Sequence, residues 1–466
     1  MLPPVPSPED YGISLQNGFL SPEPPLESLP NPYYAKWEAI AARLQPLLLS
    51  KRVRPILNQL PVLSTAYLQT EAEWRRAYVV LVFMLHGYVW GGDRPAEKIP
   101  AQLTIPLFEV CEHLEVPPVA TYAGVCLWNY KSIFPDEPTD DLDNLACLQT
   151  FTGSLDEQWF YLVSVAIEAR GAPTIPLMLE AIAAARIGDA RTVTSRLQQL
   201  AEILDEINAL LHRMHENCDP YIFYHRIRPY LAGSKNMADA GLPRGLLYDD
   251  GKNVSEYRQY GGGSNAQSSL IQFFDIVLGI EHRPTGARNS FIHEMRAYMP
   301  GPHRRFLEHV DSIANIRSFV DSRRSDGALC LAYDACLAML RAMRDTHIQI
   351  VSRYIIVQAR GARQAPSVIP AQQPAPQNLA TAVPPDSKKL RGTGGTALIP
   401  FLKQARDETG EPAIDVWARR ILSNGPAAAG SASLSKVGEH PDGHLEVVGL
   451  CGTWTADDSE GGICHW

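Results

Sequence analysis

Apolar residues recur every three or four positions over much of this 466-residue chain, which is the period of an amphipathic α-helix. The longest such pattern runs from about Gly327 to Val357, and its stripe consists of Leu329, Tyr333, Cys336, Leu340, Met343, His347, Ile350 and Tyr354. A second long stripe runs from Val193 to Met214, and residues 77–90, 159–169 and 269–280 are apolar on most faces. Helices with this composition are usually buried. With no convincing strand pairs and no internal repeat, the pattern predicts an all-α protein.

The segments between these helices differ in composition and predict how the chain is divided. The first 30 residues are rich in Pro and Ser and predict an extended arm, whereas residues 361–391 contain six prolines and predict a linker. A short helix is expected from about Pro400 to Arg406, and the Gly/Ala/Ser-rich stretch from Ser423 onward predicts a poorly ordered tail. The expected units are an arm (1–30), a small helical domain (31–150), a large helical domain (151–407) and a tail (408–466).

The overall composition narrows the class of protein. Hydrophobic residues make up 45% and charged residues 20% of the chain, as in ordinary globular proteins, and the net charge of −9 disfavours a nucleic-acid partner. The N-terminus lacks the charged and apolar regions of a signal peptide, and we judge no apolar run long enough to cross a bilayer. None of the eight cysteines forms a CxxC pair. We therefore expect a cytosolic protein without a membrane partner.

His347 is the residue on the apolar stripe that carries the most chemical interest. The commoner role for such a position is a buried, hydrogen-bonded histidine, and spacing alone favours that interpretation. A ligand role would require an apolar pocket around a single neutral imidazole. Haem iron held by one proximal histidine meets this description, whereas zinc requires three or four protein ligands.

Two further segments contain residue types that are common in functional sites. His212 and His215 lie near a helix end, where solvated histidines are a simpler interpretation than a metal site. Residues 223–228 combine aromatic rings with two arginines, and in an α-helix Tyr224 and Arg228 would share a face. An arginine beside aromatic rings can bind a carboxylate while the rings hold an aromatic substrate, although an ordinary packing cluster would look the same.

A set of short segments, in a fixed order, matches a known family. They are Tyr88–Gly91, Pro117–Pro118 with Tyr122, Phe160–Ser164, Tyr230–Gly233, Gly262–Ser269, Phe274–Ile280, Met295–Pro300, Ala332–Cys336, His347–Val351 and Gly392–Thr396. Each is weak alone, but together they are specific. The chain resembles the indoleamine 2,3-dioxygenases, and looks closest to the fungal members, from about Pro32 to about Arg406.

This resemblance implies a two-domain helical protein that binds haem b in its larger, C-terminal domain. It places the proximal iron ligand at His347, a propionate-pairing arginine at Arg344, and an acidic residue of the same side at Asp275. On the substrate side, Phe223 and Arg228 would hold the indole ring and the carboxylate. Further residues implied to surround the substrate are Tyr122, Phe160, Ser164, Gly263, Ser264 and, on a closing loop, Thr393. The chain departs from the vertebrate-like pattern at Tyr224, Val125 and Asn265, which could alter the range of indoles accepted.

The implied reaction inserts both atoms of O2 across the C2–C3 bond of tryptophan to give N-formylkynurenine. It uses ferrous haem and assigns no side chain as a general acid or base. The expected partners are L-tryptophan or related indoleamines, O2 and an electron donor that keeps the iron ferrous, with the protein a monomer. Two alternatives stay open: a haem protein of the same fold with weak tryptophan turnover that mainly binds O2, and a helical interaction module without a cofactor.

Overall fold

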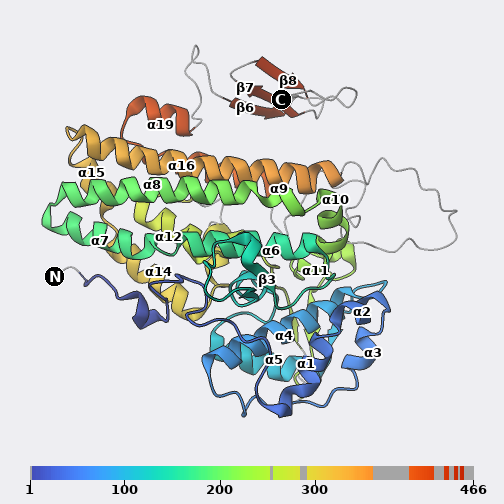
Figure 1. Ribbon diagram of the computed structural model, residues 1–466. Coiled ribbons are helices and arrows are strands. Elements are labelled where there is room, and N and C mark those ends of the chain that lie inside the picture. The colour runs from blue at the N-terminus through green and yellow to red at the C-terminus, as the bar shows by residue number, and fades with distance from the viewer. Residues whose placement is uncertain are drawn as a thin grey trace.

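A computed structural model describes residues 3–251, 256–283, 291–359 and 398–423, together with the backbone of three strands at 435–439, 445–449 and 452–455. Helices dominate these residues, so the predicted all-α class is confirmed (Figure 1). The predicted linker at 361–391 lies outside the described residues. The proposed domain boundaries at 150 and 407 stay predictions.

The N-terminal helices gather around one apolar helix, α4 (Glu71–Trp90). Every residue from Ala77 to Val89 is buried, because neighbours cover α4 on several sides. Thr70 caps its N-terminus by accepting a hydrogen bond from the backbone N–H of Glu73. The helices of this group, drawn in blue in Figure 1, are α1 (Ala35–Ala41), α2 (Leu44–Leu49), α3 (Val53–Leu57), α4 and α5 (Ala101–Leu114).

The remaining helices form a second, larger group in which α8 (Ala190–His212) and α16 (Gly327–Val351) lie side by side (Figure 1). The predicted stripe of α8 is buried from Val193 to Leu211, and it packs toward the stripe of α16. Other helices of this group are α6 (Leu155–Gly171), α7 (Thr174–Ile187), α9 (Met214–Asn217), α10 (Pro220–Ile222), α11 (Arg228–Leu231), α12 (Ser269–Leu278), α13 (Phe291–Arg296), α14 (Gly301–Ile313), α15 (Ile316–Asp321), α18 (Leu398–Thr409) and α19 (Val416–Ser423).

Three segments adopt the rare π-helical form: η3 (Ala123–Leu127), η5 (Phe223–Ile227) and η8 (Ser352–Val357). A π-helical turn contains an extra residue, so it changes which side chains face a given direction, and such turns are frequent at functional sites. The apolar periodicity did not predict them. The short 3-10 helices are η1 (Pro8–Tyr11), η2 (Pro32–Tyr34), η4 (Leu142–Asn144), η6 (Ala238–Ala240) and η7 (Asn265–Gln267).

The expectation of no strand pairs was wrong in detail. The strands are β1 (Lys98–Ile99), β2 (Tyr130–Ser132), β3 (Leu145–Cys147), β4 (Leu246–Tyr248), β5 (Glu256–Arg258), β6 (Ser435–Glu439), β7 (Leu445–Gly449) and β8 (Gly452–Thr455). They form sheets in the order β1-β4-β5, β2-β3 and β6-β7-β8; the β1–β4 pair is parallel and the others are antiparallel. Strands of two to five residues are too short to show the alternation that predicts them. The third sheet also corrects the expectation that the tail is irregular throughout.

The N-terminal segment, predicted as an extended arm, packs against the core of the protein. Ile13, Phe19 and Leu20 are buried, and the Phe19 ring centroid lies 5.9 Å from that of Phe306 on α14. Apolar side chains spaced among prolines therefore anchor this segment, although they give no helical period.

The stretch of α6 and α7, Leu155–Ile187, is long and apolar enough to cross a membrane by length and composition, contrary to the expectation from the sequence. In the structure, 72% of its apolar window is buried inside the protein. The core helix of a globular protein is also long, apolar and mostly buried. The length and composition of this stretch are therefore only weak evidence for a membrane span.

Candidate active site

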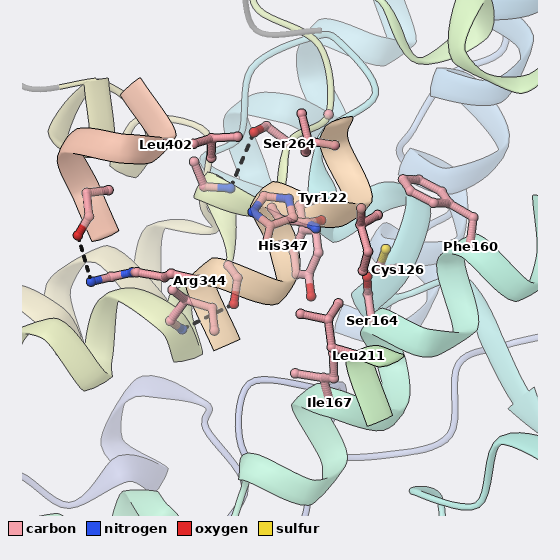
Figure 2. A pocket seen from close by; sticks show the side chains of 18 of the residues that line it. Tyr122, Cys126, Phe160, Ser164, Ile167, Leu211, Ser264, Arg344, His347 and Leu402 are labelled. Carbon is pink, nitrogen blue, oxygen red and sulfur yellow. Dashed lines mark hydrogen bonds between the residues drawn. The ribbon is translucent and has the colours of Figure 1, made fainter. Parts of the chain in front are cut away.

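One cavity brings together ten of the eleven residues singled out from the sequence. It is lined by Tyr122, Phe160, Ser164, Phe223, Arg228, Gly263, Ser264, Asp275, Arg344 and His347. Thr393 lies outside the described residues. These side chains come from segments more than 200 residues apart in the sequence, so the cavity is a product of the tertiary fold. Figure 2 shows His347 and Tyr122 in the middle of the lining, with Arg344 toward one side and Phe160 toward the other.

The imidazole of His347 faces this cavity from α16, one helical turn after Arg344. Burial lowers the pKa of His347 to about 4, and the positive charge of Arg344 acts in the same direction. The ring is therefore neutral at physiological pH, with a nitrogen lone pair available to a ligand. Within the described residues, no group of three or more His, Cys, Asp or Glu side chains could hold a bare metal ion.

Arg344 and Asp275 belong to a buried network of charges on one side of the cavity. The Arg344 Nη2 donates to both Asp275 carboxylate oxygens, at 2.6 and 2.8 Å, and Nη1 donates to Thr409 on α18. His282 lies between two carboxylates, with Nε2 at 2.9 Å from Asp275 and Nδ1 at 2.7 Å from Glu408. Burial opposes the charged ring, yet the two carboxylates raise the pKa of His282 above its ordinary value. The network ties α18 to the helix that carries His347.

The π-helical segment η5 places both Phe223 and Arg228 on the cavity. Arg228 comes five positions after Phe223, and a π-helical turn brings an i, i+5 pair onto one face. Tyr224, which an α-helix would have placed beside Arg228, is 1% exposed and is not part of the lining. It still contacts the arginine, because the guanidinium carbon lies 5.4 Å from the tyrosine ring centroid.

Aromatic rings form part of the wall of the same cavity. The ring centroids of Phe160 and Phe223 are 4.6 Å apart, and Tyr354 from η8 packs edge-on to Phe223 at 5.7 Å. The cavity therefore combines a guanidinium with apolar aromatic surface. That combination suits a ligand with a carboxylate and a flat ring.

Glycines allow the loop with Gly263 and Ser264 to reach the cavity. A Cβ atom on Gly262 would lie 2.1 Å from the carbonyl oxygen of Leu231, and one on Gly233 would lie 2.2 Å from that of Tyr260. The two backbone segments therefore touch, and only glycine fits between them.

The sequence reasoning missed several residues at this site. Phe401, Leu402 and Ala405 from α18 line the cavity, and Glu168 is buried directly behind its wall. A charged residue one turn after Ser164, inside an apolar helix, was a signal that could have found Glu168. Of the departures from the vertebrate-like pattern, Val125 and Asn265 line the cavity.

His212 and His215 are exposed, as expected for histidines near a helix end, but His212 contacts α16 and His215 contacts η8. His212 Nε2 lies 3.2 Å from the hydroxyl of Thr346, and His215 Nδ1 lies 3.2 Å from that of Tyr354.

Comparison with known proteins gives this site its context. A family model described as indoleamine 2,3-dioxygenase matches residues 7–412. The chain belongs to the indoleamine 2,3-dioxygenase family. It is therefore a dioxygenase-type oxidoreductase of a haem-dependent family associated with tryptophan catabolism.

Fungal relatives support this membership over most of the chain. An indoleamine 2,3-dioxygenase of Penicillium citrinum is 43% identical over 408 residues, which cover 86% of this chain and 87% of the relative. The indoleamine 2,3-dioxygenase of Saccharomyces cerevisiae is 41% identical, covering 87% and 93%. A 6-hydroxytryptophan 2,3-dioxygenase of Fusarium equiseti is 38% identical, covering 86% and 96%.

The side chains around the cavity fit the haem that this family uses. A macrocycle supplies four of the iron ligands, so a site with one neutral imidazole needs no further protein donors. His347 could provide that imidazole, and Arg344 one turn earlier carries a positive charge that could pair with a propionate. Apolar side chains such as Met343, Ile350 and Leu402 cover the neighbouring surface.

Proposed function

We propose that this protein is a haem-dependent tryptophan dioxygenase that inserts both atoms of O2 across the indole C2–C3 bond to give N-formylkynurenine. One observation carries the proposal: a neutral His347 shares an apolar cavity with Arg228 and Phe223. One imidazole can hold haem, and the other two side chains can hold an amino acid with an aromatic ring. The same observation supports this enzyme over the two alternatives, a haem protein with weak tryptophan turnover and a helical module without a cofactor.

The cofactor in the proposed state is haem b with ferrous iron, which would supply the chemistry with O2. His347 would bind the iron, while Arg344 would pair with a propionate. The electron donor that keeps the iron ferrous, a monomeric state and a cytosolic location remain predictions.

The residues on the substrate side act by positioning. Arg228 would bind the tryptophan carboxylate through its guanidinium group, and Phe223 with Phe160 would hold the indole ring. Burial lowers the pKa of Arg228 from its ordinary value, but a guanidinium group stays protonated in proteins at neutral pH. The cavity would exclude water from the reacting ring.

The direct test is to incubate the haem-loaded, reduced protein with tryptophan and labelled ¹⁸O2. The proposal predicts N-formylkynurenine that carries two labelled oxygen atoms. Product with a single labelled atom, or no product from a protein that binds both haem and tryptophan, would contradict it.

A ring-hydroxylated tryptophan is a second candidate substrate. The Fusarium equiseti relative is named a 6-hydroxytryptophan dioxygenase, and the cavity wall here contains the hydroxyl-bearing residues Tyr122, Ser164 and Ser264. Comparing kcat/KM for tryptophan and 6-hydroxytryptophan decides between the two substrates. A value at least about tenfold higher for the hydroxylated compound would identify it as the preferred one.

A further inference from the structure

Glu168 is a buried carboxylate placed directly behind the wall of the cavity. It lies on α6, one turn after Ser164 and next to Ile167, both of which line the cavity. Its side chain is 1% exposed. Hydroxyl groups carry the hydrogen bonding of Glu168 among the described residues.

Two hydroxyl groups of cavity-lining residues converge on the same oxygen of this carboxylate. Tyr122 donates to Oε1 of Glu168 at 3.0 Å, and Ser268 donates to it at 2.6 Å. The backbone N–H of Tyr122 is held separately by Gln267, at 2.8 Å. In the part of the chain that the structure describes, Oε2 of Glu168 is buried without a hydrogen-bond partner.

The chemistry of these groups fixes the direction of their hydrogen bonds. An ionised carboxylate can only accept, and a hydroxyl has one proton and two lone pairs. When Glu168 is ionised, the protons of Tyr122 and Ser268 are both committed to it. Toward a ligand in the cavity, the two hydroxyl groups can then only accept hydrogen bonds.

We propose that Glu168 is a positioning residue that makes this wall of the cavity a hydrogen-bond acceptor and so selects indoles that donate a hydrogen bond. The donor can be the indole N–H or a hydroxyl on the benzo ring. An N-methylated indole has no proton at that nitrogen and would lose this contact. The inference rests on the proposed function, because it assumes that an indole occupies the cavity.

Proton uptake by Glu168 would weaken this selection, because a neutral carboxylic acid no longer obliges both hydroxyls to donate to it. Burial raises the pKa of Glu168 to about 7, against the hydrogen bonds from Ser268 and Tyr122, which lower it. The groups nearest to it do not titrate near neutrality: burial raises the pKa of Tyr122 and of Cys126 far above 7, and Ser164 and Ser268 are hydroxyls. Among these described neighbours, the change near neutral pH therefore belongs to Glu168.

The matched control is Glu157, a second buried glutamate on the same helix. Its carboxylate accepts from the backbone N–H groups of Phe151 and Thr152 and from the hydroxyl of Tyr161, and it is not part of the cavity lining. Glu157→Gln therefore reports the effect of losing a buried charge from α6 without changing the wall.

The experiment measures Kd and KM for tryptophan and 1-methyltryptophan on the haem-loaded protein and on Glu168→Gln, Tyr122→Phe and Glu157→Gln. At about pH 8 we expect Tyr122→Phe to weaken tryptophan binding about tenfold, and Glu168→Gln to weaken it about threefold because a neutral amide oxygen holds the two hydroxyl protons less firmly than a carboxylate. Both variants should leave binding of 1-methyltryptophan within about twofold. The unaltered protein should lose part of its preference for tryptophan between about pH 8 and pH 6, and Glu168→Gln should show the same ratio at both values.

The outcomes separate this inference from the proposed function. If the unaltered protein binds neither indole, the proposed function fails. If it prefers tryptophan but Glu168→Gln keeps that preference, or if Glu157→Gln loses it equally, the role of Glu168 is wrong while the proposed function stands.

Discussion

The guanidinium of Arg344 and the carboxylate of Asp275 form a buried ion pair beside the candidate haem site, with Nη2 at 2.6 and 2.8 Å from the two carboxylate oxygens. They are 69 residues apart in sequence. Asp275 also accepts from His282, which reaches Glu408 on α18. Stability near the haem site should therefore depend on the protonation of this cluster.

The sign of the pH dependence follows from the three shifted groups. The raised pKa of His282 means that its contribution is fully present below its unfolded pKa of about 6.5 and is lost as pH rises through the folded value. Burial opposes ionisation of Asp275 and Glu408, but their cationic partners lower both pKa values. Their contribution is present above their unfolded pKa values, near 4, and is lost as pH falls through the folded ones.

We therefore predict that His282→Gln lowers the free energy of unfolding by about 3 kcal/mol near pH 6 and by less near pH 9. Urea unfolding at both pH values measures this. An equal loss at both values would show that the charge of His282 does not stabilise the cluster.

Arg228 should contribute mainly to substrate binding. We predict that Arg228→Ala reduces kcat/KM for tryptophan about 100-fold, because the carboxylate loses a charge-assisted hydrogen bond worth about 2 to 3 kcal/mol. Haem content should not change, because Arg228 directly follows η5, whereas Arg344 and His347 lie on α16. Tryptamine lacks the carboxylate of tryptophan. If Arg228→Ala raises the activity toward tryptamine relative to that toward tryptophan, the carboxylate role is supported. Loss of haem from the variant would argue against it.

Gly262 should tolerate no side chain. A Cβ atom at this position would lie 2.1 Å from the Leu231 carbonyl oxygen, so Gly262→Ala should separate the two backbone segments and lower stability by about 1 to 3 kcal/mol. Gly327→Ala is the control, because no atom lies within 4 Å of the equivalent position at the start of α16. Thermal unfolding of both variants measures the difference, and similar melting temperatures would contradict the close contact.

The cap of α16 should stabilise the helix that carries His347. Asp326 accepts a hydrogen bond from the backbone N–H of Leu329 at 3.1 Å, so Asp326→Ala should cost about 1 kcal/mol. Asp205→Ala, at an exposed position within α8, should change the free energy of unfolding much less. Equal effects in urea unfolding would show that the cap contributes nothing specific.

The sequence predicted the long helices well because their period is local. The stripe that contains His347 became α16 and η8, and the stripe from Val193 became α8. Short strands such as β2 and β3 have no comparable period, and their pairing depends on distant residues.

The candidate site was predicted mainly through the family resemblance. Spacing alone favoured a structural role for His347, and it placed Tyr224 with Arg228, where the π-helical turn places Phe223. Glu168 and the His282–Glu408 contact were missed, since hydrogen bonds between distant segments leave no periodic signal.

The most direct test of the account is haem retention by His347→Ala. The unaltered protein, loaded with haem, reduced and exposed to CO, should bind one haem per chain and show the Soret band of a ferrous–CO complex with an axial imidazole. His347→Ala should lose stoichiometric haem and this band, while His113→Ala, at an exposed position on α5 outside the cavity lining, should keep both. Full haem occupancy with an unchanged Soret band in His347→Ala would contradict the assignment of His347 as the iron ligand.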